Sequence, residues 1–279
     1  MLRYVGYLLM VLAVLAMAGT VVVCLIGGLQ EEFRTPGAVR LVAFDEAATT
    51  KTRVLRVGAQ LQNLDFGKPI DLSYMVARYD DGWCEGNYTN SLGVIRWVRR
   101  GPLPAGLHRY TASFPETHSR VDVRANATVW VVPAGVPALW VDAAALGPEP
   151  QAGGPAATVP SAQAMRPARD ALKTLAGGRQ VVYLVAGSAD DYAEVRERLR
   201  EAGATPGPLI WLRQGNEGER LRLLRDGWPE VDGAVVAAPV LAEAIAKLKV
   251  RIFRLPRAAD DVPQEPPKTG AVRSTGEGN

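Results

Sequence analysis

The sequence predicts three consecutive parts: an N-terminal transmembrane helix, an antiparallel β-sandwich and an α/β domain with a parallel sheet. Three observations predict this order. The chain begins with a long apolar run, continues with short alternating segments, and then alternates short apolar segments with amphipathic ones. These patterns are typical of a membrane span, of antiparallel strands and of strand–helix units, respectively. We expect an anchor and juxtamembrane segment over 1–36, a sandwich over 37–133, an α/β domain over 138–256 and a tail over 257–279.

The anchor is predicted from Tyr4–Ile26, which contains 23 residues and no charge. At about 1.5 Å per residue a helix of this length spans roughly 35 Å, enough for a hydrocarbon core of about 30 Å. A cleaved signal peptide is the alternative, because Ala16-Met17-Ala18 has a small-x-small form, but the apolar run continues well past it. We therefore expect a single-pass protein of the cell membrane, with the lipid bilayer as a partner through Tyr4–Ile26.

Orientation follows from the flanking charges. Arg3 precedes the apolar run and Glu31 and Glu32 follow it, although Arg34 and Arg40 follow it too. Acidic residues count for little in the positive-inside rule. We expect the bulk of the chain to be extracytoplasmic.

The sandwich is predicted from six β-branched, alternating segments separated by turn signals such as Asp80-Asp81-Gly82 and Gly101-Pro102. These segments are Val39–Phe44, Arg53–Leu61, Ile70–Tyr79, Leu92–Arg100, Leu107–Phe114 and Arg120–Val132. The stretch GPLPAGLHRYTASFPE resembles bacterial immunoglobulin-like modules. The resemblance implies a spacer or a docking surface, with a protein partner bound through the β-sandwich.

The arginines of this region allow two interpretations. Arg96, Arg99, Arg100 and Arg109 form either a basic patch directed at lipid headgroups or a solvated strand face.

The α/β domain is predicted from strands that alternate with amphipathic helices, an order that gives a parallel sheet covered on both faces. The strands are Ala138–Asp142, Gln180–Val185, Pro208–Leu212, Gly233–Ala237 and Val250–Leu255. The helices lie near Met165–Ala176, Ala189–Ala202, Glu217–Arg225 and Pro239–Leu248. Ser188 with Asp191, and Asn216 with Glu219, have capping-box spacing, and Pro239 suits a first helical turn. Gly147–Ser161 is expected to be a flexible excursion, and Arg257–Asn279 a disordered tail.

Composition limits the function classes. The chain of 279 residues has 32 Lys and Arg against 29 Asp and Glu, a net charge of +3, which gives no electrostatic case for a nucleic-acid partner. Two Cys and two His exclude a disulfide framework and leave almost nothing for a zinc site. We expect no metal and no cofactor.

Ligands of an open parallel sheet bind at the carboxyl ends of its strands, so the candidate residues follow each predicted strand. They are Asp142, Ala186-Gly187-Ser188, Arg213-Gln214-Gly215 and Ala237-Ala238.

The order of these elements, with the runs VVYLVAGS, LREAGATPGPLIWL and LLRDGWPEVDGAVV, resembles the haloacid-dehalogenase-like (HAD-like, Rossmannoid) phosphohydrolases. Within them it is most similar to the lipin-type phosphatidate phosphatase branch. The resemblance implies an Asp nucleophile, a second Asp two residues later as acid/base, a hydroxyl after the second strand, a cation near the third, and acids after the fourth that hold Mg²⁺.

Carried over residue by residue, Asp142 matches the nucleophile and Arg213 or Arg220 the cation. The acid/base position holds Ala144, Val185 stands where the hydroxyl is expected, and Ser188 is better explained as a helix cap. Ala237 and Ala238 replace the metal-binding acids. One carboxylate is a poor Mg²⁺ site and cannot both attack and protonate.

The resemblance therefore predicts a pseudoenzyme with a binding or scaffold role, in which Asp142 is vestigial and Ser188, Arg213 and Arg220 are the candidate binding residues. The alternative is an active phosphohydrolase acting on a lipid or cell-surface phosphate. It would use Mg²⁺, Asp142 as the nucleophile and substitute acids such as Asp190 or Asp232.

Overall fold

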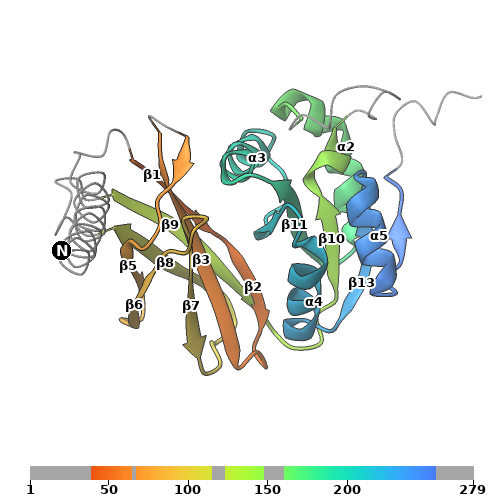
Figure 1. The fold of residues 1–279 in the computed structure, drawn as a ribbon. Helices are drawn as coiled ribbons and strands as arrows, with labels where there is room; N and C mark the ends of the chain where they lie inside the picture. The colour runs from red at the N-terminus through yellow and green to blue at the C-terminus, as the bar shows by residue number, and fades with distance from the viewer. Residues whose placement is uncertain (1–38, 65–66, 115–122, 148–159, 256–279) are drawn as a thin grey trace, which may run out of the picture.

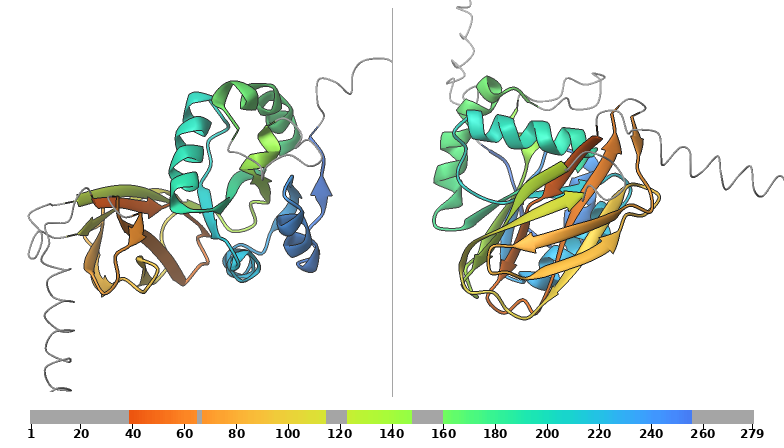
Figure 2. Two further views of the ribbon diagram at one scale, coloured as in Figure 1. Left: turned by 45° about the horizontal axis from the view of Figure 1, so that its top comes forward. Right: turned by 90° about the vertical axis from the view of Figure 1, so that its left-hand side faces the viewer.

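The computed structural model describes residues 39–64, 67–114, 123–147 and 160–255, and these form a β-sandwich-like part and an α/β part. Figure 1 shows the two parts side by side, with the sandwich strands on the left and the helix-covered sheet on the right. The turned views in Figure 2 show helices gathered around one sheet only. The change from sandwich to parallel sheet falls between Val132 and Ala138.

The sandwich consists of two sheets that enclose an apolar core. One sheet contains β1 (Val39–Phe44), β3 (Val54–Asn63), β4 (Lys68–Pro69) and β7 (Val94–Arg100). The other has the order β2 (Glu46–Thr49), β9 (Val123–Val132), β8 (Gly106–Phe114), β5 (Tyr74–Tyr79) and β6 (Cys84–Tyr88). Leu61, Met75, Trp97 and Tyr110 are fully buried between them. The inward residues alternate with exposed ones along β3 and β5, as the period of a half-buried strand requires.

Asp45 marks the point where the chain changes sheets. β1 pairs antiparallel with β3, whereas β2, directly after Asp45, pairs parallel with β9. The buried Asp45 carboxylate accepts hydrogen bonds from the backbone N–H and the hydroxyl of Thr128, both at 2.9 Å. These contacts fasten the crossing strand to β9.

The six predicted sandwich strands are confirmed in position, with four differences. β4 was not predicted because it contains only two residues, one of them proline. β2 was not predicted because its sequence EAAT is short and contains residues that are uncommon in strands. β6 was not predicted because its sequence CEGNY is short of β-branched residues. The predicted strand Ile70–Tyr79 begins only at Tyr74, and the residues before it form a loop.

The α/β part contains a five-stranded, fully parallel sheet. Its order is β12 (Leu209–Arg213), β11 (Gln180–Gly187), β10 (Ala138–Asp142), β13 (Val231–Val235) and β14 (Ile252–Phe253). The helices are η1 (Ala143–Leu146, a 3₁₀ turn), α2 (Ala162–Ala176), α3 (Ala189–Glu201), α4 (Glu217–Gly227) and α5 (Pro239–Lys247). Side chains of α2 and α3 pack on one face of the sheet, and those of α4 and α5 pack on the other. The predicted strand–helix order and the two-sided covering are confirmed.

The predicted helix starts are confirmed in two of three cases. Ser188 and Asp191 form the capping box at the start of α3, and Pro239 occupies the first turn of α5. The capping box predicted from Asn216 and Glu219 is wrong, because the Asn216 side chain makes no cap hydrogen bond. The neighbouring Glu217 instead accepts a hydrogen bond from Gly215 N at 3.0 Å.

The two parts are joined by apolar contacts that continue from one core into the other. Phe44 of β1 stacks on Trp211 of β12 with ring centroids 4.2 Å apart, and meets the edge of Tyr192 of α3 at 5.1 Å. The backbone N–H of Asp45 donates to Tyr192 Oη at 2.8 Å, and Thr52 Oγ1 donates to the Gly227 carbonyl at 2.9 Å. These contacts fix how the sandwich sits against the α/β sheet.

Several predicted segments lie outside the described residues: the span Tyr4–Ile26, most of the excursion 147–161, and the tail 257–279. Within the described ranges, no helix is both long and apolar enough to cross a bilayer.

Candidate functional site

Asp142 ends β10 at the carboxyl edge of the sheet, next to the switch point between β10 and β13. The residue is 3% exposed. Its Oδ1 accepts a hydrogen bond from Ala144 N at 3.0 Å, and its Oδ2 accepts from Ala237 N at 3.1 Å and Ala238 N at 3.0 Å. Asp142 thereby caps η1 and ties it to the loop that begins α5.

This environment suits a structural cap better than a nucleophile. Attack on phosphorus needs an accessible, ionised carboxylate oxygen. Both oxygens of Asp142 are engaged by main-chain N–H groups, and burial raises the pKa of this carboxyl although the three N–H donors lower it.

The other positions of the implied catalytic set have side chains that can neither transfer a proton nor bind a metal ion. Ala144, Ala237 and Ala238 contribute only their main-chain N–H groups to the site, and Val185 is buried in β11. The residues that the structure describes contain no group of three or more His, Cys, Asp or Glu that would hold a metal ion.

The two acids considered as substitutes, Asp190 and Asp232, form ion pairs with other residues. Asp232 lies in β13, next to the first residues of β10, because Val231 pairs with Ala138 and Gly233 pairs with Leu139. Asp142 lies three to four residues further along β10, which is about 10 Å or more along a strand. Asp232 is ion-paired with Arg179, and Asp190 with Arg40 of β1.

The three candidate binding residues do not gather at one place. Ser188 is bound into its capping box, with its hydroxyl 2.7 Å from Asp191 Oδ2. Arg213 ends β12 and is exposed. Arg220 lies on α4 and turns away from the sheet edge toward the sandwich, where it forms an ion pair with Glu46 of β2.

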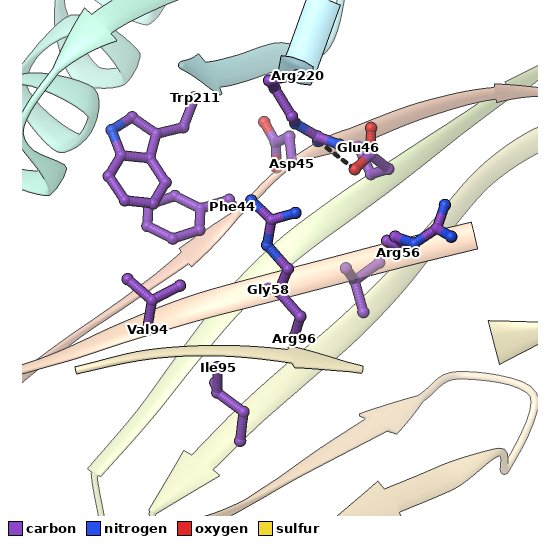
Figure 3. A pocket seen from close by; sticks show the side chains of 11 residues that line it. Phe44, Asp45, Glu46, Arg56, Gly58, Val94, Ile95, Arg96, Trp211 and Arg220 are labelled. Carbon is purple, nitrogen blue, oxygen red and sulfur yellow. Dashed lines mark hydrogen bonds and ion pairs between the residues drawn. The ribbon is translucent and has the colours of Figure 1, made fainter. Parts of the chain in front are cut away.

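Arg220 lines a pocket between the two parts of the molecule, shown in Figure 3. Phe44 and Trp211 form one wall, and Arg56 and Arg96 rise from β3 and β7. Gly58 lies between these arginines and Phe44, and a Cβ there would come within 2.9 Å of the Ile95 carbonyl oxygen. The pocket has a volume of about 30 Å³, which holds a small group and not a whole metabolite.

The pocket carries an excess of positive charge. Arg220 is paired with Glu46, whose side chain is 6% exposed, while Asp45 faces Thr128 and Arg196 instead. The guanidiniums of Arg56 and Arg96 have no hydrogen-bond or ion-pair partner among the described residues. Arg96 remains exposed at the mouth, yet burial of its guanidinium and then the nearby Arg220 lower its pKa.

A wider groove lies along the same junction. It has a volume of about 350 Å³ and runs between β9, α3 and the loop before β12. Its lining includes Thr128, Trp130, Arg196 and Arg200, and Asp45 lines both this groove and the arginine pocket. The volume is in the range of small-molecule sites, which often occur where two domains meet.

One feature of the sequence weakly indicated that charged residues are buried between the two parts. Asp45 and Glu46 interrupt an otherwise apolar stretch, and acids are seldom buried unless they are paired. Their partners Arg196 and Arg220 are about 150 residues or more away along the chain, so no local pattern connects them.

Comparison with known proteins supplies no family. Neither a family model nor a curated protein matches the chain. Among solved structures, fibronectin(III)-like modules of Clostridium thermocellum CbhA match at 14% identity and a TM-score of 0.23, over 35% of this chain and 99% of theirs. The E. coli chaperone DraB matches at 11% and 0.23, over 36% of this chain and 57% of its own.

A third solved structure, a carbohydrate acetylesterase from Xanthomonas citri, matches at 10% identity and a TM-score of 0.29, over 77% of this chain and 67% of its own. Because all three TM-scores are low, these likenesses indicate nothing about what the chain binds or catalyses.

Proposed function

We propose that this chain is a single-pass membrane protein whose extracytoplasmic part is a non-catalytic binding or scaffold module. It combines an immunoglobulin-like sandwich with a degenerate HAD-like domain. The observation that carries the non-catalytic assignment is that three main-chain N–H groups engage both oxygens of the buried Asp142. A carboxylate used in this way holds two loops together and is not available to attack a phosphate.

Strand order supports the two finer fold assignments. The sheet order β12-β11-β10-β13-β14 is the doubly wound arrangement in which the first strand lies centrally, as in Rossmann-like folds. The sandwich supports an immunoglobulin-like assignment through its sheet sizes and its sheet-switching first strand.

A turnover assay tests the absence of catalysis. The full-length chain in lipid nanodiscs is incubated with Mg²⁺ and either p-nitrophenyl phosphate or phosphatidate. We expect no release of phosphate above the level of empty nanodiscs. Magnesium-dependent release that disappears in Asp142→Asn would overturn the proposal and establish the alternative, an active phosphohydrolase with Asp142 as nucleophile. The position of Asp142 beside the switch point of the sheet favours that alternative.

The binding role is centred on the arginine pocket. Three arginines line the pocket together with the Asp45 and Glu46 carboxylates, and Arg220 is the one paired with Glu46. The guanidiniums of Arg56 and Arg96 have no acceptor among the described residues. Guanidiniums bind carboxylate, phosphate and sulfate oxygens through paired N–H donors. The small volume admits the charged end of a ligand, and the remainder would lie outside the mouth beside Arg56 and Arg96.

A thermal shift with inorganic phosphate tests this site. Compared with chloride at equal ionic strength, tens of millimolar phosphate is expected to raise the Tm of the full-length chain by about 3 °C. Arg96→Gln is expected to abolish the rise. Arg100→Gln, an exposed arginine on the same strand that does not line the pocket, is the matched control and should retain it. An equal rise in Arg96→Gln would exclude the pocket as the binding site.

A scaffold is defined by what it holds, so affinity capture of the anchored chain from its native membrane identifies the protein partner expected on the sandwich. Recovery of the same protein by the wild type and by Arg96→Gln would place its contact away from the arginine pocket.

A further inference from the structure

One end of the sandwich carries a concentration of exposed apolar side chains. Ten large apolar residues of the described chain are exposed, and five of them lie in the loops and strand ends at this end. They are Leu64 at 48%, Leu72 at 70%, Tyr74 at 45%, Tyr88 at 59% and Leu92 at 39% exposure. We call these five residues the apolar rim.

Strand register places the rim at the end where the chain enters the sandwich. Val39, the first described residue, pairs with Asn63, and Leu64 follows directly. Tyr74 pairs with Tyr88 at the same end of β5 and β6, and their rings meet edge to face at 5.3 Å.

The rim is held in place by a hydrogen-bonded frame. Leu72 has a φ of 51°, a left-handed conformation that costs free energy in any residue with a branched side chain. Its N–H donates to the Thr89 carbonyl at 3.2 Å. The hydroxyl of the buried Thr89 donates to the Ile70 carbonyl at 2.8 Å and accepts from Ser73 N at 2.9 Å. The fold therefore maintains a strained backbone that holds a leucine in solvent.

We propose that the apolar rim rests in the interface of the lipid bilayer to which the chain is anchored. This inference depends on the membrane anchor of the proposed function. Twelve residues, 27–38, separate the apolar run Tyr4–Ile26 from Val39. Fully extended they reach at most about 40 Å. Because Val39 pairs with Asn63 beside Leu64, the rim is the part of the sandwich closest along the chain to this apolar run.

The chemistry of the rim fits a membrane interface. Tyrosine rings concentrate where one end of the side chain is in hydrocarbon and the hydroxyl is in water, and leucine supplies apolar area below them. Lys68 of β4 and Asp71 of the loop that follows it are both exposed, and their charges are opposite. Binding is therefore expected to depend little on salt, unlike the attachment of a basic patch.

The alternative basic patch does not fit this orientation. Arg99 is held by Asp81 and lies over the Tyr79 ring at 4.8 Å, and Arg96 lines the arginine pocket. Arg100 pairs with Val54, at the opposite end of β3 from Asn63.

A depth measurement on the full-length chain tests the inference. A fluorophore is attached to Leu72→Cys, in a background with Cys24→Ser and Cys84→Ser, and the protein is reconstituted in lipid nanodiscs. The matched control is Val54→Cys, which is also exposed but lies at the far end of the same sandwich. Quenching by headgroup-level nitroxide lipids is expected to be at least several-fold stronger at position 72, and quenching by aqueous iodide several-fold stronger at position 54.

The outcomes separate the inference from the anchor. Failure of the wild type to elute with nanodiscs would overturn the anchor and this inference together. Elution with nanodiscs but iodide quenching equal at positions 72 and 54 would overturn the inference alone. Protection from iodide without quenching by nitroxide lipids would indicate a protein contact at the rim, and would also overturn it.

Discussion

Asp142 and Glu46 are both buried carboxylates, but the molecule satisfies them in different ways. Asp142 accepts hydrogen bonds from three main-chain N–H groups, one in η1 and two in the loop between β13 and α5. Glu46 is held mainly by the Arg220 side chain, in a pocket that also contains Arg56 and Arg96. Donors fixed by the backbone leave no room for a ligand, whereas arginine side chains can exchange one acceptor for another. The comparison indicates a structural role for Asp142, and it is the reason for proposing that a ligand binds at the junction.

The largest expected effect is the loss of Asp142. Asp142→Ala leaves three N–H groups without acceptors in a buried site, each costing about 1–3 kcal/mol. We expect the free energy of unfolding to fall by about 4 kcal/mol in urea denaturation. Asp170→Ala, at an exposed surface aspartate, serves as the control and should change it by less than about 0.5 kcal/mol. A small loss in Asp142→Ala would mean that this carboxylate is not a structural cap.

Glu46→Ala is expected to have the next largest effect. It leaves Arg220, whose side chain is 14% exposed, without its partner and next to two further cations. Breaking a buried ion pair costs about 3 kcal/mol. In contrast to Asp142→Ala, inorganic phosphate should restore part of this loss, because an anion can replace the missing carboxylate. Equal responses of the two variants to phosphate would remove the distinction between the two carboxylates.

The pH dependence of stability gives a third test. Burial raises the pKa of Asp142 in the folded state, so its contribution to stability is greatest below its unfolded pKa of about 4 and is lost as pH rises through the folded value. The difference in unfolding free energy between the wild type and Asp142→Asn should therefore shrink as pH increases from about 4, by at most about 1.4 kcal/mol per pH unit.

Asp81 serves as a control, because its contribution to stability is expected to change with pH in the opposite direction. The Arg99 side chain lowers the pKa of Asp81 to about 2, so its contribution is present above pH 4 and is lost as pH falls toward 2. The difference between the wild type and Asp81→Asn should accordingly shrink on acidification. A slope of the same sign for both aspartates would contradict the assignment of burial as the dominant influence on Asp142.

Local sequence patterns predicted the helices and strands, whereas the roles of the candidate site residues depend on contacts with residues far away in the sequence. The spacing around Ser188 and Asp191 predicts its capping box because all the atoms involved lie within one helical turn. Asp142 was placed correctly at a strand end, but two of its three hydrogen-bond donors lie about 95 residues later in the chain. Arg220 was proposed for the sheet edge and instead pairs with Glu46, 174 residues away.

The loop at Leu72 was missed for a related reason. The sequence IDLSYMVARY has strand-like composition throughout, and only the packing of Thr89 against Ile70 and Ser73 bends its first part into a loop. A residue 16 or more positions away therefore overrides the local preference.

The smallest expected effect also separates the two carboxylates most directly. Arg96→Gln alone should change the free energy of unfolding by less than about 0.5 kcal/mol, because lost packing is offset by relief of repulsion from Arg220 and Arg56. In the Glu46→Ala background the repulsion is uncompensated, so Arg96→Gln should recover about 1 kcal/mol. In the Asp142→Ala background it should recover nothing, because that site has no side-chain cation in contact. Additive behaviour in both double-mutant cycles would show that the arginines of the pocket do not act on Glu46 as a group.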